Sequence, residues 1–198
     1  EFHWVGPFEG LKTVTFPGPI GEQEVCYIPH PETRTMPQSL GARAVSVQGC
    51  FPPHAMRLAK AMLESGLYSE EPLTLKGTET TAFDTMYDLL LALPESKETP
   101  LWAYGLLVDV FGTRDGRHVH ARLWNRHPPQ EEWGGKAAYY KNIAIPLSIG
   151  AQMIGRGDVK ARGVLPPETV LGPQVFFDEL QRRGIEIHEQ VEEYHVLG

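Results

Sequence analysis

The clearest fold signal in the chain is residues 101–126, LWAYGLLVDVFGTRDGRHVHARLWNR. Two runs with the character of β-strands flank Thr113-Arg114-Asp115-Gly116, where the glycine can take the positive φ that a hairpin turn needs. The first arm, residues 101–111, is apolar at nearly every position, which is typical of a strand that is covered on both faces. The stretch therefore predicts a long antiparallel hairpin.

Upstream of the hairpin, extended or alternating patterns predict three strands, at residues 11–16, 22–28 and 43–51. Residues 17–21, PGPIG, predict a turn because prolines fix φ and glycines allow it to be positive. Residues 29–41 contain three prolines and a glycine, so we expect a loop there with at most one helical turn.

Four helices follow from apolar stripes and terminal signals. The first is predicted to run from Pro52-Pro53 to Gly66 and the second from near Thr81 to Pro94. The third is predicted to run from Pro146 to Gly155–Gly157, and the fourth from Pro173 to Gly184. The second has Asp84 as a capping partner of Thr81. The residues expected to face inward on the last two are Ile149, Met153, Ile154, Phe176, Phe177 and Leu180. A final strand is predicted at residues 185–194.

This order of elements predicts an α+β fold, with helices packed on one face of a mixed, largely antiparallel sheet. By the two-residue repeat of a strand, one face of the hairpin's first arm carries Trp102, Tyr104, Leu106, Val108 and Val110. Either the fold buries this face internally, or a second subunit covers it.

Composition limits the function classes. The chain has 198 residues, 41% of them hydrophobic, as expected for one globular domain. Its longest aliphatic run, residues 89–93, is far shorter than the roughly 20 residues of a membrane span. A net charge of −7 argues against nucleic-acid binding. Residues 114–162 alone carry +5, which could attract a carboxylate or phosphate ligand or be an ordinary solvated surface.

Two cysteines, Cys26 and Cys50, do not make a disulfide framework. Both lie in apolar stretches, so we expect them to be reduced and buried, and we expect the protein to be cytoplasmic. Residue 1 is Glu and no secretory signal pattern follows it, so the chain is expected to begin after processing or to be part of a longer protein.

Common catalytic and cofactor motifs are missing. Gly155-Arg156-Gly157 follows a predicted helix and has Lys160 where a dinucleotide fingerprint needs a third glycine, so no cofactor-binding residue is assigned. No residue is assigned as a catalytic acid, base or nucleophile. His118 and His120 share a strand face and could form a zinc site with His127. We favour the alternative, a polar outward face that also carries Arg122, and assign no metal ligand.

Two polar segments are candidate ligand sites. His30 lies in a proline-stiffened loop after a predicted strand, where ligand groups often lie. Lys141 and Asn142 come just before the helix predicted to begin at Pro146, and the free N–H groups of a helix N-terminus favour an anion. These two side chains could help hold a carboxylate, or Asn142 could cap the helix locally while Lys141 stays solvated.

Five segments carry a family resemblance: FPGPIG (16–21), HPETRTMP (30–37), PLSIGAQMI (146–154), GVLPPE (163–168) and PQVFFDELQRRGI (173–185). They resemble the saccharopine dehydrogenase-like oxidoreductases, which include saccharopine reductases, lysine 6-dehydrogenases and carboxynorspermidine synthases. GVLPPE is the most specific of the five. The resemblance covers the two ends of the chain and is weak from about residue 55 to 135.

The resemblance implies a two-part enzyme of which residues 1–198 are the C-terminal substrate-binding and dimerisation domain. Such a domain is similar to the C-terminal domain of glyceraldehyde-3-phosphate dehydrogenase, while an N-terminal Rossmann domain, absent here, binds NAD(P). The implied reaction is oxidation or reduction at a C–N bond of an amino acid or a polyamine-type compound. His30, Arg34, Lys141 and Asn142 are then the candidates to face the substrate, since arginine can hold a carboxylate through two hydrogen bonds.

One departure from the family pattern concerns Ile143-Ala144, because members often carry Thr-Gly there, two residues before the proline that matches Pro146. The added side chain would keep the backbone from approaching a ligand, so we expect either a substrate other than saccharopine or the loss of this contact. The resemblance implies a homodimer through the sheet, a small amino-acid-like substrate, and neither nucleic acid nor membrane as a partner. The competing hypothesis is a non-catalytic scaffold or small-ligand-binding module with the same fold.

Overall fold

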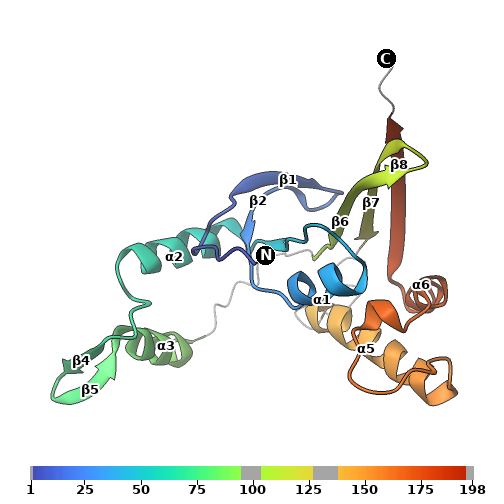
Figure 1. Ribbon diagram of the computed structural model, residues 1–198. Helices are drawn as coiled ribbons and strands as arrows, with labels where there is room; N and C mark the ends of the chain where they lie inside the picture. The colour runs from blue at the N-terminus through green and yellow to red at the C-terminus, as the bar shows by residue number, and fades with distance from the viewer. Residues whose placement is uncertain (1, 95–103, 127–137, 195–198) are drawn as a thin grey trace.

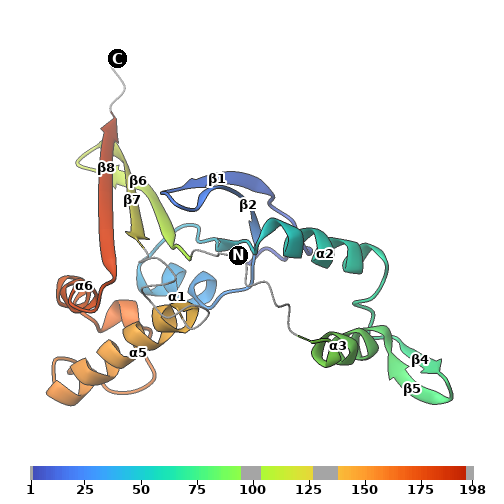
Figure 2. The same cartoon turned by 180° about the vertical axis from the view of Figure 1, so that it is seen from behind.

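The computed structural model describes residues 2–94, 104–126 and 138–194, and it confirms the α+β class (Figure 1). In chain order the elements are β1 (Lys12–Phe16), β2 (Gly21–Tyr27), α1 (Glu32–Ser39), β3 (Gln48–Gly49), α2 (Pro53–Glu64), β4 (Pro72–Leu75), β5 (Thr78–Thr81), α3 (Ala82–Ala92), β6 (Leu107–Arg114), β7 (Arg117–Arg126), α5 (Ala138–Arg156), the short 3-10 helix η2 (Pro167–Thr169), α6 (Pro173–Gln181) and β8 (Glu186–Tyr194). Figures 1 and 2 show α3, β4 and β5 at one end of an extended molecule and α5 and α6 at the other.

The strands form three separate sheets where the sequence predicted one. Their orders are β1-β2-β3, β4-β5 and β6-β7-β8, and every strand pair in the described ranges is antiparallel. The predicted strand at residues 43–51 is reduced to Gln48–Gly49, and the β4-β5 hairpin was not predicted. The prediction of a single mixed sheet is therefore wrong: β3 pairs with β2 over two residues and with no other described strand, and β4 and β5 pair only with each other.

The predicted long hairpin is confirmed, with a tighter turn. Arg114 pairs with Arg117, so the loop is only Asp115-Gly116, whose φ values are 51° and 77°. Positive φ at both positions matches the right-handed twist of the flanking strands, and Asp-Gly is a favoured pair there. β8 pairs along the whole of β7, from His118 opposite Tyr194 to Arg126 opposite Glu186.

Helix ends follow the local signals in α2 and α3. Gly66 ends α2 with φ of 79°, and Leu67 N–H donates to the Met62 carbonyl at 3.0 Å, as in a Schellman motif. Thr81 Oγ1 accepts a hydrogen bond from the Asp84 amide at 2.9 Å, which confirms the predicted cap of α3.

Two helices differ from their prediction. α1 has eight residues where at most one turn was expected, and it tolerates Pro37 near its C-terminal end. α5 begins at Ala138, so Pro146 lies inside it. Pro146 interrupts one backbone hydrogen bond, but residues before and after it continue a single apolar face, and packing of that face outweighs the lost bond.

The largest described core lies between α5, α6 and β8. Ile149, Met153, Leu180 and Ile185 are buried, and Ile145, Val159, Leu171, Phe176, Phe177 and Ile187 pack against them. The inward residues predicted on α6 are thus confirmed, and so are Ile149 and Met153. Ile154 is 64% exposed, because five positions from Ile149 on a helix point to the opposite side.

The prediction that the first hairpin arm is covered on both faces is wrong for the described residues. Leu106, Val108 and Val110 share one face, as the two-residue repeat predicted, and each is more than half exposed. Trp102 lies outside the described residues. Both cysteines are free; Cys26 is buried, whereas Cys50 is half-buried and burial, together with the neighbouring Cys26, raises the pKa of its thiol. Among the described helices, none is long and apolar enough to cross a membrane.

Candidate functional site

One face of the β6-β7-β8 sheet carries a cluster of charged side chains. The register places Asp109 opposite Arg122, Arg122 opposite Gln190, and His120 opposite Glu192. Because side chains alternate along a strand, these groups all point to the same face, while Val108, Val110 and Val191 point to the other. The first face is therefore polar around Asp109, whereas the second carries the valines in its middle and the ion pairs of Glu193 with Arg114 and Arg117 near the hairpin turn.

Asp109 is the centre of this polar face. Arg122 donates to its carboxylate through Nε at 2.8 Å and through a terminal nitrogen at 3.1 Å, and His120 Nε2 lies 2.7 Å from the same carboxylate. The Phe111 ring stacks on the His120 ring, with 4.4 Å between centroids. The hydrogen bonds from Arg122 hold the pKa of Asp109 below its ordinary value, with a further contribution from His120 and against the opposing effect of burial.

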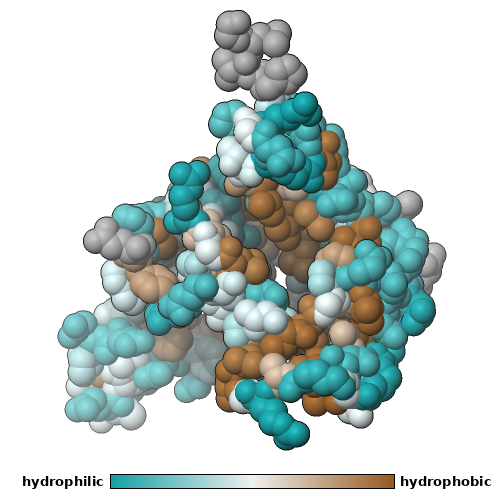
Figure 3. Space-filling model, turned by 45° about the vertical axis from the view of Figure 1, so that its right-hand side comes forward, coloured by the Kyte–Doolittle hydropathy of each residue, from teal (hydrophilic) through white to brown (hydrophobic). Residues whose placement is uncertain are grey.

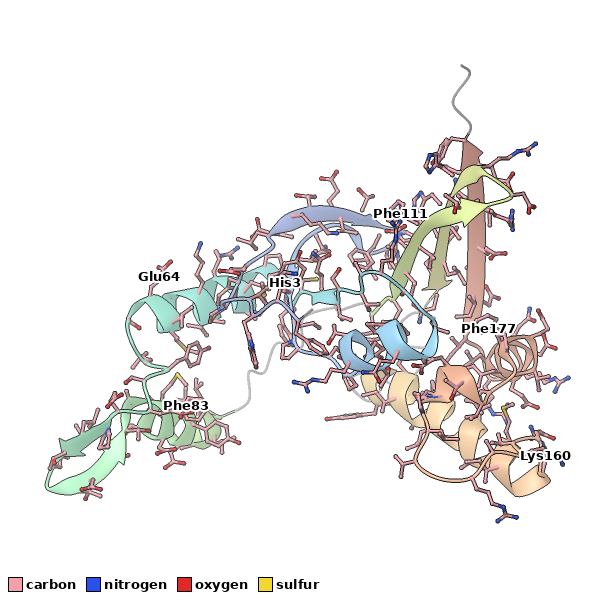
Figure 4. The ribbon with its side chains drawn as sticks, viewed as in Figure 1. His3, Glu64, Phe83, Phe111, Lys160 and Phe177 are labelled. Atoms are coloured by element: carbon pink, nitrogen blue, oxygen red, sulfur yellow. The ribbon has the colours of Figure 1, made fainter. Side chains whose placement is uncertain are left out.

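A hollow of about 100 Å³ lies beside this cluster, lined by His120, Arg122, Gln190 and Glu192. Arg122 and His120 give one part of its wall donor character, while the Glu192 carboxylate accepts hydrogen bonds from Gln190 and from the Tyr194 hydroxyl. The hollow can take a small polar group. Figure 4 shows Phe111, which borders the cluster, on the sheet formed by the later strands.

The proposed histidine metal site does not form from the described residues. None of the described His, Cys, Asp and Glu side chains gather in groups of three that could hold a metal ion, and His127 lies outside the described ranges. His120 instead shares Asp109 with Arg122. His118, His120 and Arg122 share one face of β7, as the favoured interpretation expected of these three residues.

A second polar contact joins two distant segments at the junction of α1 with η2. Ser39 Oγ donates to the Glu168 carboxylate at 2.7 Å, across 129 positions of sequence. Burial tends to raise the pKa of Glu168, but hydrogen bonds from Ser39, from its own amide and from Thr35 outweigh this and lower it. The α1–η2 junction therefore brings together the HPETRTMP and GVLPPE segments.

His30 and Arg34 lie on the α1 side of this junction. His30 Nδ1 contacts the Glu32 carboxylate, and the His30 carbonyl accepts a hydrogen bond from Thr33 Oγ1 at 2.7 Å. The Arg34 guanidinium lies over the Phe2 ring, 5.4 Å from its centroid, and the side chain is exposed. A cation held against an aromatic ring keeps its hydrogen-bond donors free at the edges.

Lys141 and Asn142 lie near the N-terminal end of α5. The argument that they precede an anion-binding helix end at Pro146 is wrong, because the helix begins at Ala138 and continues through that proline. Both residues engage other groups. The structure thus places the four candidate residues on two segments, His30 and Arg34 at α1 and the other two on α5.

Sequence reasoning missed Asp109 and Glu168. The signal for Asp109 was present, because it is a lone charge within the apolar run LLVDVF. A two-residue Asp-Gly loop fixes the register of the hairpin and pairs Asp109 with Arg122 directly. For Glu168 no local pattern indicates Ser39 as a partner, since their contact depends on how distant segments pack.

The described residues lack the features of a dinucleotide site. Such a cradle requires a strand, a glycine-rich turn and a helix within a parallel sheet. The described strand pairs are antiparallel, and Gly155 and Gly157 lie at the C-terminal end of α5 and do not follow a strand. These parts of the chain do not fit the group.

The hydrogen bonds of Asp109 with Arg122 and His120 predict that stability depends on pH. The pKa of Asp109 is lowered in the folded state. Its contribution to the free energy of unfolding is therefore complete above the pKa that Asp109 has in the unfolded chain, and is lost as the pH falls through the lowered pKa. We expect Asp109→Asn to lose less unfolding free energy than the unmodified protein between neutral and acidic pH, as measured by urea unfolding. Asp115→Asn, in the turn of the same hairpin, is the control, and an equal change in both variants would contradict the prediction.

A known family matches most of the chain. The family model described as "Saccharopine dehydrogenase C-terminal domain" matches residues 4–185. The matched range includes the α1–η2 junction, the β6-β7 hairpin and all of the large core except Ile187.

Proposed function

Since the chain belongs to the saccharopine dehydrogenase C-terminal domain family, we propose that it is the substrate-binding and dimerisation domain of an NAD(P)-dependent oxidoreductase. The proposed reaction is oxidation or reduction at a C–N bond of an amino acid or a polyamine-type compound. NAD(P) supplies the hydride chemistry in such enzymes. Because the described residues do not fit a dinucleotide, we propose that another part of the enzyme holds it.

The observation that carries the proposal is the hydrogen bond between Ser39 and Glu168. It joins the end of α1, just after the HPETRTMP segment, to the GVLPPE segment, and it holds α1 against η2. Arg34, on α1, then offers a guanidinium to a substrate carboxylate, and His30 lies just before the same helix. Lys141 and Asn142 on α5 remain candidates for the other side of the substrate.

The valines on one face of the β6-β7-β8 sheet support a homodimer. Val108, Val110 and Val191 are exposed there, and Figure 3 shows hydrophobic residues at the surface in the centre and lower part of its view. Exposed apolar surface of this extent is usually covered by another protein surface. We propose a second copy of the chain as that cover, and a cytoplasmic location in which both free cysteines stay reduced.

A non-catalytic ligand-binding module is the second candidate. The observation in its favour is Ile143-Ala144 in place of the Thr-Gly found in many family members, together with the exposure of Ile143. The two candidates differ in one assay. Reduction of NAD(P)⁺ by the intact protein with an amino-acid substrate supports the enzyme, and ligand binding without turnover supports the module.

The role of Arg34 can be tested in the intact protein. We expect Arg34→Ala to raise KM for a carboxylate substrate about tenfold and to change kcat little, because a charge-assisted hydrogen bond is worth about 1.5–3 kcal/mol. Arg34→Lys should recover only part of the loss, since lysine does not form the paired contact. Arg117→Ala, at an exposed arginine of β7, is the control. An unchanged KM for Arg34→Ala would remove this residue from the site.

A further inference from the structure

A second hollow, separate from the one beside Asp109, lies between the N-terminal part of the chain and α2. Its volume is about 250 Å³, slightly below the range of about 300–1,000 Å³ that is typical of drug-sized ligands. Figures 1 and 2 both show the start of α2 beside the β1-β2-β3 sheet. The hollow is lined entirely by residues between positions 8 and 60, so it suits a small molecule held by this part of the chain alone.

Apolar side chains line the hollow on both sides. Phe8 and Leu11 come from the segment before β1, whereas Phe51 and Met56 come from the beginning of α2 and the residues that lead into it. Leu11 and Phe51 are 45% and 69% exposed. A ligand with an apolar body would remove this surface from water, and the gain grows with the apolar area that it covers.

Two cations lie beside these apolar groups. Met56, Arg57 and Lys60 are spaced so that they share one side of α2, and all three line the hollow. Neither Arg57 nor Lys60 forms a hydrogen bond or an ion pair with any residue in 2–94, 104–126 and 138–194. Their donors are therefore available to a ligand that carries a negative charge.

The charge around the hollow differs from that of the surrounding chain. Residues 1–113 contain 7 basic and 14 acidic side chains, a net charge of −7. The hollow has two basic side chains and one acidic one, Glu24, so its lining carries a net charge of +1. A single negative charge on the ligand balances this lining, whereas Glu24 opposes a ligand with several negative charges.

Phe8 lines the hollow from an unusual backbone conformation. Its φ is 60°, a value that bulky residues rarely adopt. Two hydrogen bonds hold its loop, because Glu9 N–H donates to the Gly6 carbonyl at 3.2 Å and Tyr27 N–H donates to the Glu9 carbonyl at 2.9 Å. Strained backbone of this kind is concentrated at functional sites, where the surrounding structure holds a side chain in place for a ligand. The conformation of Phe8 is thus a second observation, independent of charge, that indicates a ligand site.

We propose that this hollow binds a small organic carboxylate with an apolar or aromatic body. Arg57 and Lys60 donate hydrogen bonds to the carboxylate, and the body covers Phe8, Leu11 and Phe51. The hollow includes none of the four residues proposed to face the substrate, so it is a second ligand site. The inference therefore does not depend on the proposed oxidoreductase function.

The test titrates the full chain, with its methionine methyl groups labelled with carbon-13, and follows the methyl resonances by NMR. The chain has five methionines, and Met56→Leu identifies the resonance of Met56. The probe is phenylacetate, and its two controls are phenylacetamide, which lacks the charge, and acetate, which lacks the ring. We expect phenylacetate to shift the Met56 resonance with saturation in the millimolar range or below, and each control compound to bind about tenfold more weakly.

Two variants divide the site into its charged and apolar parts. We expect the double variant Arg57→Gln with Lys60→Gln, and separately Phe51→Ser, to raise the dissociation constant of phenylacetate about tenfold. Arg117→Gln with Lys160→Gln is the matched control, because it removes the same charge at exposed positions elsewhere and should leave the constant unchanged. The other four methionine resonances report whether each variant is folded.

Three results would overturn the proposal. One is the absence of a saturable shift of the Met56 resonance up to about 20 mM phenylacetate. Another is equal affinity for phenylacetate and phenylacetamide, which would remove the role of the two cations. The third is an equal loss of affinity in the matched control, which would show that phenylacetate responds only to the overall charge of the chain.

Discussion

Replacing Ile149 with alanine is expected to lower the free energy of unfolding by about 3 kcal/mol, the middle of the range for large-to-small changes at buried positions. Ile149 is 1% exposed and lies among Met153, Leu180 and Ile185. Truncation removes methyl and methylene groups that touch α6 and the start of β8, and the surrounding helices close the resulting cavity only in part. Urea unfolding followed by far-UV circular dichroism measures the loss.

Ile154→Ala is the matched control, since it is the same substitution on the same helix. Ile154 is exposed in the single chain, so we expect its truncation to cost less than about 0.5 kcal/mol at concentrations where the chain is monomeric. Equal losses at the two positions would show that α5 does not present Ile149 to the core. The helix would then be rotated from the orientation in which Ile149 is buried and Ile154 is exposed.

Local signals predicted most of the elements. The Asp115-Gly116 turn, the Thr81 cap and the Gly66 stop each act through a few adjacent residues, and the structure has all three. The start of α5 was predicted wrongly because Pro146 is a strong local signal for a helix N-terminus. The helix continues through Pro146 because residues on both sides of the proline pack against α6 and β8. Sequence spacing alone does not reveal that packing.

The candidate site was predictable in part. The family resemblance indicated the segments around His30 and Glu168 without indicating that they meet. Their contact joins positions 129 residues apart, and it depends on the path of the chain through the whole fold. The Asp109–Arg122 pair was accessible from the hairpin register. The expectation of one sheet failed because strand patterns do not specify which strands pair when several short hairpins are available.

Gly10→Ala is expected to cost about 3 kcal/mol, because it combines two unfavourable effects. Gly10 has φ of 70°, a conformation that side chains rarely adopt, and an added Cβ would lie 2.3 Å from the Tyr27 ring. The ring cannot easily move with its backbone, since Tyr27 N–H donates to the Glu9 carbonyl at 2.9 Å and ties β2 to the preceding loop. The loss of unfolding free energy is measured by urea titration of the variant and the unmodified protein.

Gly21→Ala separates the two effects. Gly21 has φ of 68°, nearly the same as Gly10, but a Cβ there would meet nothing within 4 Å. We therefore expect only the backbone cost, about 1 kcal/mol. The difference between the two variants is the cost of the contact with Tyr27. Similar losses in both would mean that the Tyr27 ring rotates away from the added methyl group at little cost, and would contradict the prediction.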